Sequence, residues 1–343
     1  MTESPKAAMA DPAEIERALA RVKAARQAIV SELRKVIVGQ DDPIDQVLVA
    51  MFAGGHCMIQ GPPGTAKTLL ATCVAQVMDL SFKRIQFTPD LMPSDISGTE
   101  ILEEDQTTGR RMLRFAKGPV FSNIVMADEI NRTPPKTQAA LLEVMQERQV
   151  TLGGRTYPLP EPFYVIATQI SLEQEGTYPL PEAQQDRFML TISMNYLPER
   201  SEAQVVRRST GAEAVELQKV IGATDLLAFA QAVRQVTLPP ALSRYVVDLV
   251  ASSRPTVPGC PDFVKEYVAW GAGLRASQNI ALAAKSAAAQ DGRSTVEPQH
   301  IRKAIVPVMR HRIGLSFRAE VDHVSVEDVI RRLTQACPEP PSH

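Results

Sequence analysis

The segment Gly61-Pro62-Pro63-Gly64-Thr65-Ala66-Lys67-Thr68 constrains the fold of this chain more than any other feature. It follows the apolar run His56–Gln60, which predicts a strand, and it opens a predicted helix, Thr68–Met78. In this setting consecutive backbone N–H groups surround phosphate groups, helped by the positive end of the helix dipole. We expect Lys67 to reach the outer phosphates and the Thr68 hydroxyl to hold Mg²⁺. The segment predicts a phosphate-binding loop in an α/β core.

One position in this loop departs from the strict pattern, which has glycine before the lysine. Ala66 stands there in this chain. Alanine tolerates helical geometry and adds only a methyl group, so we expect the departure to be mild. The predicted nucleotide contacts therefore extend through the whole loop, from Gly61 to Thr68, and on to Leu69.

A second motif supplies two carboxylates. The apolar run Ile124-Val125-Met126-Ala127 predicts a buried strand, and it ends in Asp128 and Glu129. Ligands bind at the carboxyl ends of the strands in open parallel sheets, so the two acids should lie beside the phosphate loop. We expect Asp128 to hold Mg²⁺ through water and Glu129 to act as general base on the attacking water.

The rest of the core shows the same alternation of short apolar runs with helical segments. Further strands are predicted at 83–87, 123–127 and 164–168. This alternation predicts a three-layer αβα core with a mainly parallel sheet. Apolar residues at heptad spacing from Ile15 to Val36 predict a long helix, and we favour one packed on the core over a coiled coil.

Beyond Pro198 the pattern becomes helical, which predicts an all-α second domain. Helices are expected at 199–208, 223–236, 241–253, 264–290 and 298–311. We therefore expect a disordered tail at 1–12, an N-terminal helix and nucleotide-binding core at 13–200, a helical lid domain at 201–336, and a second tail at 337–343.

Composition excludes several other classes of protein. The formal net charge is −2, so no global basic field attracts nucleic acid or acidic membrane. The 4 cysteines form no C-x-x-C pair and the histidines show no ligand spacing, which argues against disulfides and zinc. The start lacks a signal-peptide core, and no apolar run is long enough to span a bilayer. These features predict a cytoplasmic protein.

Several longer strings resemble the MoxR family of AAA+ ATPases. They are Ala127-Asp128-Glu129-Ile130-Asn131-Arg132-Thr133-Pro134-Pro135-Lys136-Thr137-Gln138-Ala139-Ala140-Leu141-Leu142-Glu143, the segments 87–98 and 174–184, and Asp186-Arg187-Phe188. The resemblance covers residues 30–315. It implies a P-loop NTPase that binds ATP with Mg²⁺ at subunit boundaries of a ring, usually a hexamer. It also implies a protein substrate or adaptor, with a von Willebrand factor A-domain protein as a possible partner.

The resemblance also implies roles for individual residues. Arg187 is similar to the arginine finger that a neighbouring subunit inserts against the γ-phosphate. Arg275 is similar to the sensor-2 arginine of the lid, although Gly273-Leu274 stands where the family has Ser-Pro. Arg132 is either a second contact to a neighbour's nucleotide or a residue that serves only packing.

Two segments, at about 88–118 and 147–162, resemble the family's insertions within the core. In the second, the run 149–159 alternates around Gly153-Gly154, which predicts a hairpin. In the first, 106–110 is expected to form the tip of another hairpin. In related motors such hairpins flank the central pore and touch the substrate.

One departure from the family bears on activity. Ile170 stands where the family has the sensor-1 asparagine, and isoleucine cannot hydrogen-bond the γ-phosphate or the attacking water. Losing one such donor costs on the order of 10²–10³ in rate. Thr168 or Gln169 could partly substitute. We therefore expect intact binding with slow or partner-dependent hydrolysis.

Three functions are consistent with these features. The first is a MoxR-type ATPase that remodels, matures or activates a partner protein, in the manner of a chaperone. The second is a nucleotide-gated assembly module with little or no hydrolysis, because of Ile170. The third is a nucleic-acid motor, which the sequence does not favour because it has neither a basic-aromatic stripe nor a DNA-binding appendage.

Overall fold

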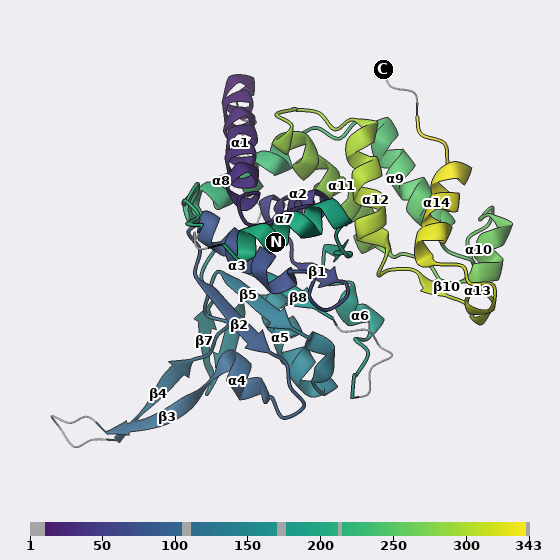
Figure 1. Cartoon of the computed structure of the whole chain (residues 1–343). Coiled ribbons are helices and arrows are strands. Elements are labelled where there is room, and N and C mark those ends of the chain that lie inside the picture. The colour runs from purple at the N-terminus through teal and green to yellow at the C-terminus, as the bar shows by residue number, and fades with distance from the viewer. Residues whose placement is uncertain (1–10, 105–110, 170–175, 212–214, 341–343) are drawn as a thin grey trace, which may run out of the picture.

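A computed structural model describes residues 11–104, 111–169, 176–211 and 215–340 (Figure 1). Its main sheet has the strand order β2-β5-β8-β1-β9, and every neighbouring pair is parallel. The strands of this sheet are β1 (Cys57–Gln60), β2 (Phe82–Gln86), β5 (Ile124–Asp128), β8 (Tyr164–Thr168) and β9 (Leu190–Ser193). Four of them were predicted from apolar runs, and β9 was not.

The central strands are buried on both faces, as expected of a parallel sheet covered by helices. Every residue of β5 is buried, and its side chains alternate between two cores. Ile124 and Met126 belong to one core, and Val125 and Ala127 to the other. The predicted three-layer αβα arrangement is confirmed.

Helices cover each face of the sheet. The first face packs against α1 (Pro12–Leu33), α2 (Asp41–Phe52) and α3 (Lys67–Val77), and the second against α5 (Pro135–Glu147). Leu19, Val22 and Ile29 of α1 are fully buried within the same chain, and Ile15 is partly buried against the same core. The apolar repeat therefore serves core packing and not a coiled coil, as predicted.

Two hairpins extend from the core. The first insertion contains α4 (Pro93–Ser97), β3 (Gly98–Glu104) and β4 (Arg111–Lys117), and the β3–β4 hairpin projects away from the body of the molecule (Figure 1). The predicted tip at 106–110 lies outside the described residues. The second insertion pairs β6 (Gln149–Leu152) with β7 (Arg155–Pro158), which confirms the hairpin around Gly153-Gly154. Both of these glycines have positive φ.

Beyond Pro198 the chain is mainly helical, as predicted. A four-residue helix, α6 (Glu182–Gln185), lies just before β9. The helices beyond Pro198 are α7 (Glu199–Ser209), α8 (Ala223–Gln235), α9 (Pro240–Ser252), α10 (Asp262–Tyr267), α11 (Leu274–Gln290), α12 (Pro298–Met309), α13 (Phe317–Val321) and α14 (Val326–Ala336). A short antiparallel pair, β10 (Val268–Trp270) and β11 (Gly314–Leu315), joins them.

The expected single helix at 264–290 is wrong, because β10 and the segment 271–273 divide it into α10 and α11. A side chain at Gly271 would overlap the carbonyl oxygen of Ser253, so the backbones approach too closely there for a continuous helix. Near the C-terminus, residues 337–340 contact the lid: Glu339 forms an ion pair with Arg302 (3.1 Å). No helix within the described ranges is both long and apolar enough to cross a membrane.

Candidate functional site

The predicted phosphate loop joins β1 to α3 at the carboxyl edge of the sheet. The ammonium group of Lys67 donates to the carbonyl oxygens of Gly61 (2.9 Å) and Pro62 (2.7 Å), so it lies over its own loop. The Thr65 hydroxyl also donates to Pro62 (2.9 Å). Gly61 has a φ of 155°, and a side chain there would overlap the carbonyl oxygen of Met194. This close approach of two backbones requires glycine at position 61.

Ala66 does not have the helical geometry that we expected. Its φ of 66° and ψ of 27° are left-handed, and it precedes the first residue of α3. A left-handed conformation costs an alanine about 1–2 kcal/mol relative to glycine. The departure from the glycine pattern is therefore a local strain at the loop and not a mild change.

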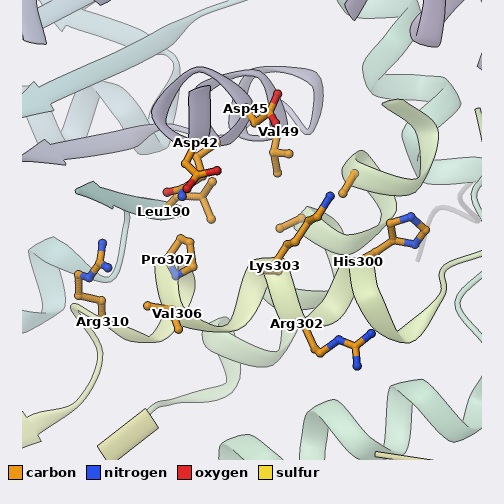
Figure 2. A pocket seen from close by; sticks show the side chains of 14 residues that line it. Asp42, Asp45, Val49, Leu190, His300, Arg302, Lys303, Val306, Pro307 and Arg310 are labelled. Carbon is orange, nitrogen blue, oxygen red and sulfur yellow. The ribbon is translucent and has the colours of Figure 1, made fainter. Parts of the chain in front are cut away.

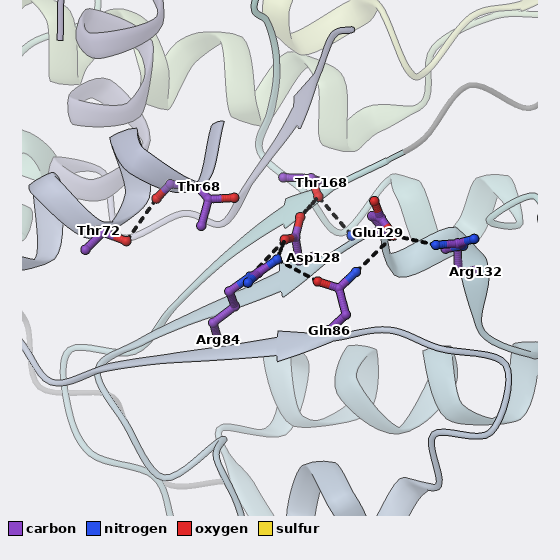
Figure 3. A network of polar contacts seen from close by, with 8 residues as sticks. All are labelled: Thr68, Thr72, Arg84, Gln86, Asp128, Glu129, Arg132 and Thr168. Atoms are coloured by element: carbon purple, nitrogen blue, oxygen red, sulfur yellow. Dashed lines mark hydrogen bonds and ion pairs between the residues drawn. The ribbon is translucent and has the colours of Figure 1, made fainter. Parts of the chain in front are cut away.

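The two acids lie on the same edge as the loop (Figure 3). Asp128 ends β5, and one of its carboxylate oxygens accepts a hydrogen bond from Thr168 on β8 (2.5 Å). The backbone N–H of Glu129 donates to the same hydroxyl (2.8 Å). Burial lowers the pKa of Lys67, and the negative charges of Asp128 and Glu129 oppose that shift. Lys67 is therefore close enough to both carboxylates for their negative charges to act on it.

The side chains at this edge fit a magnesium nucleotide. Asp128 and Thr68 provide one carboxylate and one hydroxyl, and Mg²⁺ commonly takes its remaining ligands from phosphates and water. The described part of the chain has no group of three or more His, Cys, Asp or Glu residues that could hold a metal on its own.

Sequence reasoning missed the partner of Asp128. Arg84 on β2 donates to the second carboxylate oxygen of Asp128 through two nitrogens (2.9 and 2.5 Å). Arg84 and Gln86 have the same strand parity, and Gln86 is in register with Asp128 across the β2–β5 pair. The alternation of 83–87 could have shown that Arg84 and Gln86 share one face of their strand, but not that Asp128 lies on the same face, which depends on the register of β2 with β5.

Glu129 is also held by neighbouring side chains. Its carboxylate accepts from Gln86 (2.9 Å) and from Arg132 (3.2 Å), as Figure 3 shows. Its backbone is left-handed, with a φ of 57°. Arg132 therefore contacts the predicted general base of its own chain. Ile170 lies outside the described residues, and Gln169 accepts a hydrogen bond from Gln60 (2.8 Å).

The two arginines that the family resemblance pointed to lie at the other edge of the sheet. β1 and β9 are parallel and in register, so the residues that precede them share the amino edge. Arg187 precedes β9 and donates to the carbonyl oxygen of Leu142 (2.5 Å). Arg275 on α11 lines the same cavity of about 150 Å³ as Arg187, with His56 from the segment before β1. The structure brings these arginines together, but not beside Lys67 of their own chain.

A separate cavity of about 370 Å³ lies between α2 and the lid helices α11 and α12 (Figure 2). Asp42 and Asp45 lie on its α2 side, and Lys303 and Arg310 lie on its α12 side. No residue of the phosphate loop lines it. It is distinct from the candidate nucleotide site.

Comparison with known proteins fits this arrangement. Chaperone MoxR1 of Mycobacterium tuberculosis is 43% identical over 327 residues, covering 95% of this chain and 85% of that protein. The chain belongs to the MoxR family of AAA+ ATPases. Protein MoxR of Methylorubrum extorquens is 30% identical, covering 90% of this chain and 93% of its own length.

Profile and structural comparisons of this MoxR-family chain agree. A profile described as "ATPase family associated with various cellular activities (AAA)" matches residues 56–190, and one described as "AAA lid domain" matches residues 262–333. The crystal structure of a candidate ATPase from Cytophaga hutchinsonii superimposes with a TM-score of 0.87 at 39% identity. It covers 96% of this chain and 99% of that one.

Proposed function

We propose that this MoxR-family chain binds and hydrolyses ATP at the boundaries between subunits of a ring. The cycle would be used to remodel, mature or activate a partner protein. One observation carries the proposal. The predicted phosphate-binding residues lie at the carboxyl edge of the sheet, and the predicted charge-stabilising arginines lie together at the amino edge. Each subunit thus carries the two halves of the site at opposite edges of its sheet. A complete site would form only where the carboxyl edge of one subunit meets the amino edge of another.

At the carboxyl edge, the residues of one subunit bind and orient the triphosphate. Residues 61–68 supply backbone N–H groups, and Lys67 leaves its loop carbonyls to contact the outer phosphates. Thr68 and Asp128 would hold Mg²⁺, which neutralises charge on the phosphates when bound. Glu129 accepts the proton of the attacking water once its contacts with Gln86 and Arg132 loosen.

At the amino edge, Arg187 and Arg275 would act on the nucleotide of the neighbouring subunit. Positive charge placed against the transferring phosphoryl group stabilises the transition state, and one such arginine is worth about 10³–10⁵ in rate. Hydrolysis then depends on correct contact between subunits. A head-to-tail contact of this kind forms a ring when the rotation between neighbouring subunits closes, and a hexamer is the size that the family resemblance favours.

A second candidate function is a nucleotide-gated assembly module. Ile170 favours it, because it removes a hydrogen-bond donor from the position of sensor 1. The Thr168 hydroxyl is committed to Asp128 and Glu129, so it is a weaker substitute than we expected. In this alternative ATP would hold the ring together without turnover.

Phosphate release, measured beside a Glu129→Gln variant, separates the two functions. The ATPase predicts measurable release by the natural chain and on the order of 10²–10⁴ less by the variant. Equal, near-zero rates with intact ATP binding would favour the assembly module.

The partner is proposed to be a protein, such as one with a von Willebrand factor A domain. The Glu129→Gln variant with ATP should retain it on the ring and allow its capture. The thiols Cys57, Cys73, Cys260 and Cys337 are free, which suits the reducing cytoplasm. Nucleic acid is not the proposed substrate, and DNA-stimulated turnover would argue against this view.

A further inference from the structure

The amino-edge arginines are organised by a neighbouring carboxylate, that of Asp186. This residue directly precedes Arg187 and ends the short helix α6. One of its carboxylate oxygens accepts from Arg312 (2.7 Å) and the other accepts from Arg275 (3.1 Å). A single carboxylate of the core therefore joins two arginines of the lid.

Arg312 is the fixed partner of the two. Its side chain is 2% exposed, and its five N–H donors all reach acceptors. Besides the Asp186 carboxylate, these acceptors are the carbonyl oxygens of Asp186, Phe188, Met189 and Val308. A buried guanidinium needs such a complete set of partners, because an unpaired buried charge is strongly destabilising.

The two residues before Arg312 also contact the backbone of the segment that follows Asp186. Arg310 donates to the carbonyl oxygen of Thr191 (3.0 Å), and His311 contacts that of Phe188 (3.1 Å). Burial keeps the pKa of His311 well below its ordinary value, so this ring is neutral. Three consecutive lid residues thus hold the backbone that begins with Asp186 and runs into β9, and the position of that carboxylate is set by the lid.

Arg275 is the more exposed partner. Its side chain is 49% exposed, and Asp186 is its ion-pair partner. It shares a cavity with Arg187, and Arg312 carries a third positive charge nearby. Like charges this close repel one another, and the Asp186 carboxylate offsets the repulsion. His56 adds no charge to the cavity, because burial lowers its pKa to about 4.

We propose that Asp186 is a positioning residue that holds Arg275 beside Arg187, so that both arginines reach the nucleotide of the same neighbouring subunit. This inference rests on the proposed function. Asp186 touches no nucleotide and acts through Arg275. Because Arg275 and Arg312 belong to the lid, a movement of the lid would displace the amino-edge arginines and so change the nucleotide site of the neighbouring subunit.

A double-mutant cycle tests whether Asp186 acts through Arg275. Asp186→Asn keeps an acceptor for Arg312 and removes the charge that holds Arg275. Misplacing a group by about 1 Å can cost up to 10²-fold, so we expect turnover to fall about 10- to 100-fold with little change in ADP affinity. In an Arg275→Ala background the same change should have no further effect on turnover. A full additional loss in that background would overturn the proposal.

Mixing of subunits tests whether Asp186 acts in trans. Asp186→Asn subunits mixed with Lys67→Ala subunits should regain turnover, because the intact loop of one then meets the intact arginines of the other. Mixed with Arg187→Ala subunits they should not, because both defects lie at the same edge. Recovery in the second mixture, or in neither, would overturn the proposal.

Two further measurements keep the outcomes separate. Thermal unfolding checks that Asp186→Asn folds. If it does not, Asp186→Glu takes its place in the same mixtures, with the same criteria: it keeps a negative charge for Arg312 but shifts the carboxylate by one methylene group, which misplaces Arg275. A reference mixture of Lys67→Ala with Arg187→Ala reports on the proposed function alone. If the reference recovers and the Asp186 mixture does not, only the role of Asp186 is wrong; if the reference also fails, the shared site is wrong.

Discussion

The two edges of the parallel sheet differ in how the sequence encodes them. At the carboxyl edge, the functional residues are contiguous: the loop 61–68 and the pair Asp128-Glu129 each follow directly from a buried strand. At the amino edge, Arg187 and Arg275 are far apart in sequence, and the lid brings them together through Asp186 and Arg312. The first edge is fixed by local backbone geometry and the second by tertiary packing.

This difference indicates how the two edges should respond to change. The carboxyl edge acts on a nucleotide bound by its own chain, so its variants should alter binding or chemistry within one subunit. The amino edge has no phosphate loop beside it, so its variants should leave nucleotide affinity intact and impair the neighbour.

Arg187→Ala should have the largest effect, because it removes the charge that stabilises the transition state. We expect turnover to fall by about 10³–10⁵, with ATP affinity within about twofold of the natural chain. Phosphate release and calorimetry measure the two quantities. Arg244→Ala serves as the control, since that arginine is 79% exposed on α9 and should change neither. A loss of ATP affinity in Arg187→Ala would place this arginine at its own nucleotide.

Glu129→Gln should lower turnover by about 10²–10⁴, because the amide cannot accept the proton of the attacking water. Nucleotide affinity should be retained, and assembly on ATP should become more stable. Single-turnover phosphate release and sizing of the complex with ATP measure these effects. Glu143→Gln, an exposed position on α5, is the matched control. Unchanged turnover in Glu129→Gln would remove this residue from the chemistry.

Arg84→Ala should lower the Mg²⁺ concentration that nucleotide binding requires. Arg84 pairs with the carboxylate proposed to hold the metal, so the ion pair and the metal compete for Asp128. The side chain of Arg84 is half-exposed, so we expect the pair to be worth up to about 1 kcal/mol, and the Mg²⁺ concentration at half-maximal ADP binding should fall about fivefold. Lys83→Ala, on the opposite face of β2, should leave it unchanged. An increased requirement would mean that Arg84 supports the metal site.

Ile170→Asn should raise turnover severalfold or more, since it supplies the hydrogen-bond donor that the family has at this position. ATP affinity should change little. Steady-state phosphate release by the two chains, with and without a partner protein, measures the effect. An unchanged rate would contradict the view that Ile170 slows hydrolysis.

Ala66→Gly should have the smallest effect, on stability. Relief of about 1–2 kcal/mol of left-handed strain is partly offset by about 0.5–1 kcal/mol of backbone entropy. We expect the free energy of unfolding to rise by about 0.5 kcal/mol. Ala228→Gly, at an exposed helical position of α8, should instead lower it by about 1 kcal/mol. A loss of stability in Ala66→Gly would show that the strain is not present in solution.

Much of the carboxyl edge could be predicted from the sequence, because a strand, a glycine-rich turn and a helix form a local signal. β9 was missed because Leu190–Ser193 is short and has no turn signal of its own, and its place beside β1 comes from tertiary pairing. The left-handed backbone of Ala66 could not be read from residue type, since alanine is a good helix former.

The amino edge could be predicted only in part. Family resemblance pointed to Arg187 and Arg275, but no pattern in the sequence shows that they share a cavity. Their shared position depends on where the lid packs. Arg84 was missed for a related reason, because its contact with Asp128 needs the register of two strands.

The central claim is that the two edges form one site only when they come from different subunits. An equimolar mixture of Lys67→Ala and Arg187→Ala chains tests it most directly, by phosphate release after native mass spectrometry has shown mixed assemblies. Each variant alone should be nearly inactive. Random mixing leaves about a quarter of head-to-tail contacts with an intact loop facing intact arginines, so the mixture should turn over at about a quarter of the natural rate. A mixture no faster than either variant alone would contradict the account.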